Sequence, residues 1–98
     1  MWYVKKKIPV QAIQIPDNDF VKEGTNWLRD KAPQWLVDNC ALGIVRYSEE
    51  GMIVSTLEGD MLCPWGSYMV CGIKGELYPC RRDVFEETYE PVGERWKN

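Results

Sequence analysis

Between residues 43 and 80 the sequence alternates short runs of β-branched and aromatic residues with turn residues at close intervals. A run at 44–47 and a run at 52–57 flank a loop that ends in Gly51, which is typical of a β-hairpin. Further turns lead into more short runs, predicted at 60–63, 68–71 and 76–79. Strands of this length are not stable singly. The stretch therefore predicts an antiparallel meander that must curl or pack.

Residues 2–15 predict a further strand, because β-branched and aromatic side chains are frequent there. Pro9 interrupts this run and indicates an edge position or a bulge. Beyond Pro9 the pattern has the period of two that a sheet strand requires. The two faces of the strand are Val10, Ala12 and Gln14 on one side and Gln11, Ile13 and Ile15 on the other.

Residues 20–40 are predicted to form a helical segment that Pro33 divides. Proline lacks a backbone donor but is tolerated in the first turn of a helix. We therefore expect a second helix to begin near Ala32 or Pro33 and to end at Cys40. Gly43 follows as a stop signal, since glycine readily adopts the left-handed conformation at helix ends.

A closing helix is predicted at 81–89, with Val84, Phe85 and Thr88 toward the core. The last residues, 93–98, have no pattern and are expected to form a loose tail.

Together these elements predict a single α+β domain spanning residues 1–98. We expect a curled, mostly antiparallel sheet of about five or six short strands. The helical segment 20–40 should pack on one side of the sheet, and the helix 81–89 should close its end. The side chains on the apolar phase of each element, expected in the core, are Ile13, Trp35, Leu36, Val54, Val70 and Phe85.

Composition narrows the class of protein. An apolar content of 45% with five tryptophans predicts a globular chain. No apolar run reaches the roughly 20 residues of a membrane span, and the N-terminus lacks the apolar core of a signal peptide. The expected location is therefore the host cytoplasm, with no membrane partner. The net charge of -3 and the dispersed basic residues do not indicate nucleic-acid binding, and the carboxylates are too sparse for a mimic of DNA.

The cysteines do not predict a metal site. They form no Cys-x-x-Cys pair and the chain has no histidine, whereas zinc sites take two ligands from one tight turn. We expect reduced thiols that act as small buried apolar groups, with no metal and no cofactor. Without histidine, Cys80 lacks the usual base that activates a nucleophile. No phosphate loop or serine elbow is present either, so an enzyme is not expected, although a carboxylate-only site stays open.

The segment 78–83 is the densest cluster of groups with binding potential. Its two arginines lie beside Tyr78 and a predicted helix start, and such groups bind phosphate or carboxylate. In the alternative, Tyr78 packs, Asp83 stabilises the helix start and the arginines are solvated. Trp65, in a glycine-containing turn, is either an exposed anchor for a partner protein or folded back over the sheet. The candidate residues for partner or ligand binding are Trp65, Tyr68, Tyr78, Arg81 and Arg82.

Residues 72–89 read Gly-Ile-Lys-Gly-Glu-Leu-Tyr-Pro-Cys-Arg-Arg-Asp-Val-Phe-Glu-Glu-Thr-Tyr. This run resembles the signature G-x-K-G-E-L-Y-P-C-x-x-D-x-F-E-x-T-Y-E of a family of small phage and prophage proteins, in which a PGDY-like turn precedes it. The segments 10–14 and 33–36 are similar to the family's V-x-A-I-Q strand and P-x-W-L helix start.

The chain departs from the family pattern in two places. Trp65-Gly66-Ser67-Tyr68 stands where the family has Pro-Gly-Asp-Tyr, and Arg81-Arg82 stands where it often has Lys-Pro. Loss of the turn aspartate argues against an acid–base or ligand role for a carboxylate there. The retained glycine suits a backbone role.

The resemblance implies a phage or prophage accessory protein and no particular chemistry. We expect a non-enzymatic protein that binds a host protein, such as a component of a defence system. The alternative is an oligomeric small-ligand binder that sequesters a nucleotide-like anion at Tyr78, Arg81 and Arg82. An exposed aromatic patch would favour the first hypothesis, and a concave arginine-lined pocket would favour the second.

Overall fold

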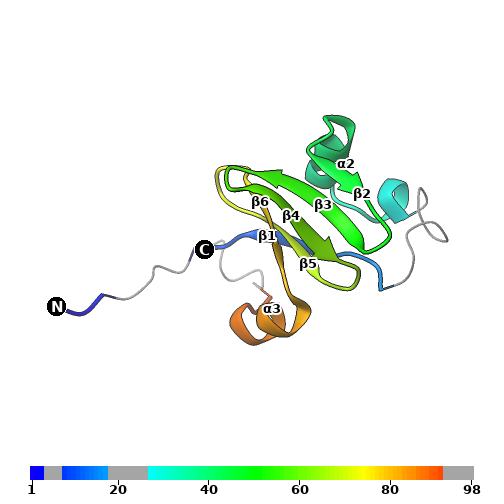
Figure 1. Ribbon diagram of the computed structural model, residues 1–98. Helices are drawn as coiled ribbons and strands as arrows, with labels where there is room; N and C mark the ends of the chain where they lie inside the picture. Colours follow the sequence, from blue (N-terminus) through cyan, green and yellow to red (C-terminus); the bar gives the residue numbers. More distant parts are fainter. Residues whose placement is uncertain (4–7, 18–26, 92–98) are drawn as a thin grey trace.

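The computed structural model describes residues 1–3, 8–17 and 27–91, which form a single α+β domain (Figure 1). Six strands make two three-stranded antiparallel sheets, with the orders β1-β5-β6 and β2-β3-β4. Residues 27–30 are also helical. The elements are β1 (Gln11–Gln14), α2 (Gln34–Ala41), β2 (Val45–Tyr47), β3 (Gly51–Thr56), β4 (Gly59–Pro64), β5 (Tyr68–Cys71), β6 (Leu77–Cys80) and α3 (Arg82–Thr88).

The predicted α+β class and the short antiparallel strands are confirmed, but the strands form two sheets instead of one. The separation occurs at the turn between β4 and β5. There the backbone N–H of Ile15 donates to the carbonyl of Ser67 at 2.9 Å, and the N–H of Gly66 donates to the carbonyl of Pro16 at 2.8 Å. These bonds direct the chain along β1, so β5 pairs with β1 and β6 and not with β4.

The N-terminal strand is shorter than predicted. Of the predicted range 2–15, only Gln11–Gln14 is strand, and residues 4–7 lie outside the described part of the chain. The strand begins after Pro9, as expected for a residue that has no N–H to donate to a ladder. β1 lies at the edge of its sheet. Ahead of it, Trp2 is 98% exposed.

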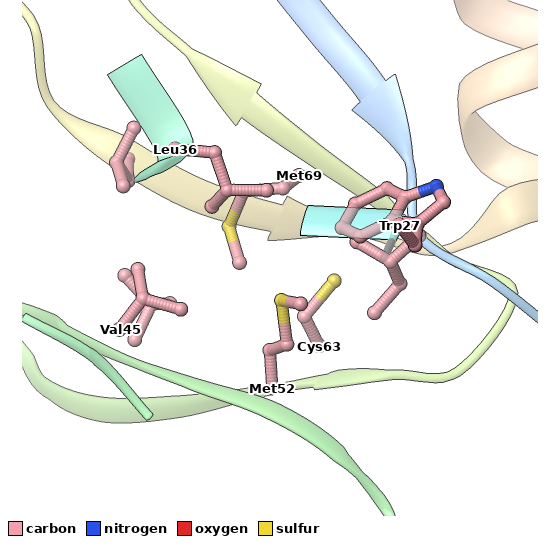
Figure 2. Close-up of a cluster of buried hydrophobic side chains, with 9 residues drawn as sticks. Trp27, Leu36, Val45, Met52, Cys63 and Met69 are labelled. Carbon is pink, nitrogen blue, oxygen red and sulfur yellow. The ribbon is translucent and has the colours of Figure 1, made fainter. Parts of the chain in front are cut away.

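The hydrophobic core lies between the two sheets and is closed by α2 and the helical residues 27–30 (Figure 2). Figure 2 shows side chains from the two sides converging on one space. The strand residues in this core are those that face inward, because successive side chains of a strand point to opposite faces of the sheet. The buried members are Ile15, Trp27, Leu36, Val45, Met52, Val54, Cys63, Met69 and Leu77.

Of the six side chains predicted to be buried, Leu36, Val54 and Val70 are fully buried. Ile13, Trp35 and Phe85 are only partly buried, so the prediction overstated their burial. Ile13 and Trp35 pack against the margin of the core. Phe85 lies on α3 and contacts aromatic rings outside the core, as described below.

Helix α2 confirms the local signals. It begins directly after Pro33 and ends at Ala41, one residue beyond the predicted end. Gly43 has a φ of 79°, its N–H donates to the carbonyl of Cys40 at 3.1 Å, and the N–H of Ile44 donates to the carbonyl of Asn39 at 3.0 Å. This pair of bonds is the Schellman motif. Residues 18–26 of the predicted helical segment lie outside the described residues.

Helix α3 confirms the predicted closing helix in position but not in packing. Val84 and Thr88 are exposed, not directed toward the core. Figure 1 shows α2 and α3 on opposite sides of the strands. The predicted tail at 93–98 lies outside the described residues. No helix in the ranges that the structure describes is long and apolar enough to cross a membrane.

Candidate binding surface

The structure places the five candidate residues in two separate settings. Trp65 lies in the turn between β4 and β5, next to the loop that joins β2 and β3. Tyr68, on β5, and Tyr78, on β6, lie near α3 together with the two arginines at its start, Arg81 and Arg82.

The turn that carries Trp65 is closed by a bond from the N–H of Ser67 to the carbonyl of Pro64 at 2.9 Å. Its third residue, Gly66, has a φ of 90°, which residues with a side chain adopt only with strain. The backbone role expected for this glycine is therefore confirmed.

Trp65 folds back on the domain. Its indole Nε1–H donates to the carbonyl of Glu49 at 2.9 Å, and its backbone N–H donates to the carbonyl of Glu50 at 3.2 Å. The half-buried ring packs against the core. Of the two alternatives left open by the sequence, this geometry matches the second. Trp65 thereby holds the β2–β3 loop in place.

An aromatic cluster, consisting of Tyr68, Tyr78, Phe85 and Tyr89, joins α3 to the β1-β5-β6 sheet. The rings of Tyr68 and Phe85 stack with their centroids 3.9 Å apart and their planes 13° apart. Phe85 stacks in turn on Tyr89 at 4.7 Å. The hydroxyl of Tyr68 donates to Glu86 Oε2 at 3.3 Å. Each stacked pair of this kind stabilises a fold by about 0.5–1.5 kcal/mol, in addition to the contribution from the apolar area that the rings bury.

Tyr78 completes the aromatic cluster from β6. Burial raises the pKa of Tyr78 to about 12, and a hydrogen bond with Tyr89 acts in the same direction. The phenol is therefore neutral at physiological pH. Tyr78 packs and bonds within the cluster, as in the alternative that the sequence left open.

Both arginines of the candidate site face carboxylates. Arg81 donates to both carboxylate oxygens of Asp83, at 3.2 and 2.7 Å, and this hydrogen bonding is the main cause that lowers the pKa of Asp83. Asp83 Oδ1 also accepts the backbone N–H of Val84 at 2.9 Å, at the start of α3. Arg82 lies 3.8 Å from Asp17 and 3.6 Å from Glu86. These cations are partly neutralised within the chain.

The cysteines are poor candidates for nucleophiles. All four are free thiols, and burial raises the pKa of each of them. Cys63, in the core, has its pKa raised to about 12. Protonated thiols are weak nucleophiles and weak metal ligands. Among the described residues, no group of three or more histidine, cysteine, aspartate or glutamate side chains could hold a metal ion.

An open groove on the solvent face of the β2-β3-β4 sheet was missed by the sequence analysis. Its volume is about 520 Å3, and it is lined by Ser48, Glu49, Glu50, Ile53, Asp60, Met61 and Leu62. The period of two along β3 and β4 is the signal that could have found it, because Ile53 and Leu62 occupy the phase opposite to the core residues Met52 and Cys63.

The fold and these surfaces define a small α+β domain with charged and aromatic groups on its surface. Comparison of the chain with protein-family models, with curated proteins and with solved structures gives no match.

Proposed function

We propose that this chain is a phage or prophage accessory protein that acts without catalysis by binding a host protein in the cytoplasm, such as a component of a defence system. The observation that carries the proposal is that α3 is ordered but exposed on the surface of the domain. This helix is held in a defined orientation by the aromatic cluster, yet none of its seven described residues is buried.

A helix as short as α3 is not stable alone in water, since helix nucleation is costly. Here the stacking of Phe85 between Tyr68 and Tyr89 orders it. Its outer surface combines an exposed apolar side chain, Val84, with charged neighbours. Interfaces between proteins combine apolar side chains at the centre with a polar rim. An ordered helix also loses little conformational entropy when it binds.

The same geometry gives less support to the anion-binding alternative. The guanidinium of Arg81 already donates two bonds to Asp83, and Arg82 lies near Asp17 and Glu86. These carboxylates compete with a nucleotide-like anion for both arginines. The Tyr78 phenol is occupied by Tyr89.

Affinity capture from a bacterial lysate, followed by mass spectrometry of proteins and small molecules, tests the proposal. We expect one host protein to be captured in stoichiometric amount, and its binding to weaken in Val84→Asp and in the double variant Arg81→Ala, Arg82→Ala. The matched control is Lys31→Ala with Lys74→Ala, which removes two exposed cations away from α3.

Two results would contradict the proposal. If a small anion co-purifies with the parent protein and is lost in the arginine variant, the ligand-binding alternative is correct. If a captured protein binds the parent and both α3 variants equally, and all of them melt at the same temperature, α3 is not the contact surface.

A further inference from the structure

The groove on the β2-β3-β4 sheet has an aliphatic floor. Ile53 on β3 and Leu62 on β4 are partners in the antiparallel register, so their side chains lie next to each other on the solvent face. Leu62 is 40% exposed, whereas its neighbour Met61, which also lines the groove, lies on the phase of the core residue Cys63. Side chains of this type on an open sheet face provide contact area for another apolar group.

At one end of the groove, three polar side chains form hydrogen bonds with one another. Arg46 donates to Asp60 Oδ2 at 2.7 Å and to the Ser55 hydroxyl at 3.1 Å, and Ser55 donates to Asp60 Oδ1 at 3.1 Å. The charge of Asp60 is therefore largely balanced by Arg46.

The other end carries Glu49 and Glu50, in the loop between β2 and β3. Both are exposed, and within the part of the chain that the structure describes no salt bridge joins either carboxylate to a cation. This end of the groove is therefore negatively charged, in contrast to the balanced end at Asp60.

The acidic loop is held in a defined position. Trp65 donates to the carbonyls of both Glu49 and Glu50, as described above. Within the loop, the Ser48 hydroxyl donates to the carbonyl of Gly51 at 3.0 Å and accepts the N–H of Glu50 at 3.2 Å. A loop whose backbone is fixed in this way presents its side chains with little loss of entropy on binding.

We propose that this groove binds a basic segment of a partner protein, with the methylene stem of a lysine or arginine on Ile53 and Leu62 and its cationic head at Glu49 and Glu50. Long basic side chains suit such a site, because they cover apolar surface with their stems while the charged end stays near solvent. The site is separate from α3, so this proposal does not depend on the function proposed for that helix.

The probe for this site is an end-blocked peptide of alternating lysine and leucine, titrated into 15N-labelled protein. We expect saturable changes in amide chemical shift at Glu50, Ile53 and Leu62, and weaker binding as salt is raised. Two comparison peptides separate the contribution of charge from that of apolar contact. Replacing lysine by glutamate should abolish the shifts, and replacing leucine by serine should weaken them.

The double variant Glu49→Gln, Glu50→Gln should weaken peptide binding about fivefold, the effect of losing two partly exposed ion pairs. Glu87→Gln with Glu90→Gln is the matched control, since it removes the same charge elsewhere and should bind like the parent. Trp65→Phe keeps an aromatic side chain but removes the indole donor to Glu49, so it should also weaken binding while the domain stays folded.

The proposal is overturned if the acidic peptide causes the same shifts, if the shifts fall outside the groove, or if the Glu49 and Glu50 double variant binds as tightly as the control. A 15N spectrum with parent-like dispersion is required of each variant. If the double variant does not fold, the single variant Glu49→Gln, with Glu87→Gln as its control, decides the same question.

Discussion

The two helices α2 and α3 are similar in length but differ in what holds them. α2 has a fully buried leucine, Leu36, a proline at its start and a glycine motif at its end. α3 has no buried residue and is held by ring stacking and exposed ion pairs. α2 is therefore part of the core, whereas α3 is an ordered appendage. The difference separates a region that stability requires from one that can change without unfolding the domain.

Leu36→Ala should cause the largest effect. Removing a fully buried leucine side chain costs about 2–5 kcal/mol, which is a large part of the stability of a small domain. Denaturant unfolding would measure the loss. The matched control is Leu42→Ala, one residue after α2, because Leu42 is 74% exposed and its truncation should change stability little. Equal effects of the two variants would show that α2 does not pack as described.

Phe85→Ala should have a smaller and local effect. It removes both stacked pairs at once, and we expect a loss of about 2 kcal/mol that is confined to α3. Hydrogen exchange would show faster exchange of the α3 amides with unchanged protection of β3. Val84→Ala is the control on the exposed face. If Phe85→Ala also exposes β3, α3 belongs to the same cooperative unit as α2.

Gly43→Ala tests the cap of α2. An alanine there meets no neighbouring atom within 4 Å, so the only cost is the left-handed backbone, about 1 kcal/mol. Thermal unfolding should show the decrease. Gly43→Asn should lose less, since asparagine tolerates this conformation better than alanine does. A stability of the alanine variant equal to that of the parent would mean that the cap does not need a positive φ.

Arg81→Ala should have the smallest effect on stability, because its ion pair with Asp83 is exposed. The sensitive measurement is the titration of Asp83 by NMR. Its pKa is below the ordinary value chiefly because Arg81 donates to it, so the variant should titrate at higher pH. A carboxyl group whose pKa is lowered on folding stabilises the fold at pH values above its ordinary pKa. This contribution is lost as the pH falls through the lowered pKa. The stability of the Arg81→Ala variant should therefore depend less on pH in the acidic range. An unchanged titration of Asp83 in this variant would contradict its pairing with Arg81.

These contrasts also show what the sequence could predict. Pro33 and Gly43 act through their own backbones, so the limits of α2 were predictable to within one or two residues. The hairpin around Gly51 is equally local. Pairing of β1 with β5 depends on residues far apart in the chain, and no local pattern indicates it, so the division into two sheets was not predicted.

The candidate site was predictable only in part. Tyr68, Tyr78 and Arg82 gather near α3, but Trp65 lies elsewhere and holds a loop. The stacking partner Phe85 was assigned to the core, because its position on a helix shows that it is apolar but not which surface it meets. Whether binding occurs at the predicted residues stays a prediction.

The division of the strands into two sheets has a consequence for the order of folding. β2, β3 and β4 are joined by short turns and can pair as soon as they are synthesised. β1 must wait until β5 exists, and the side-chain amide of Gln14 reaches its acceptor, the carbonyl of Gly66, across 52 residues. Contacts between distant residues slow folding because the loop between them must close first. The β2-β3-β4 sheet should therefore form early on the ribosome, and docking of the N-terminal strand should be a late step that completes the domain.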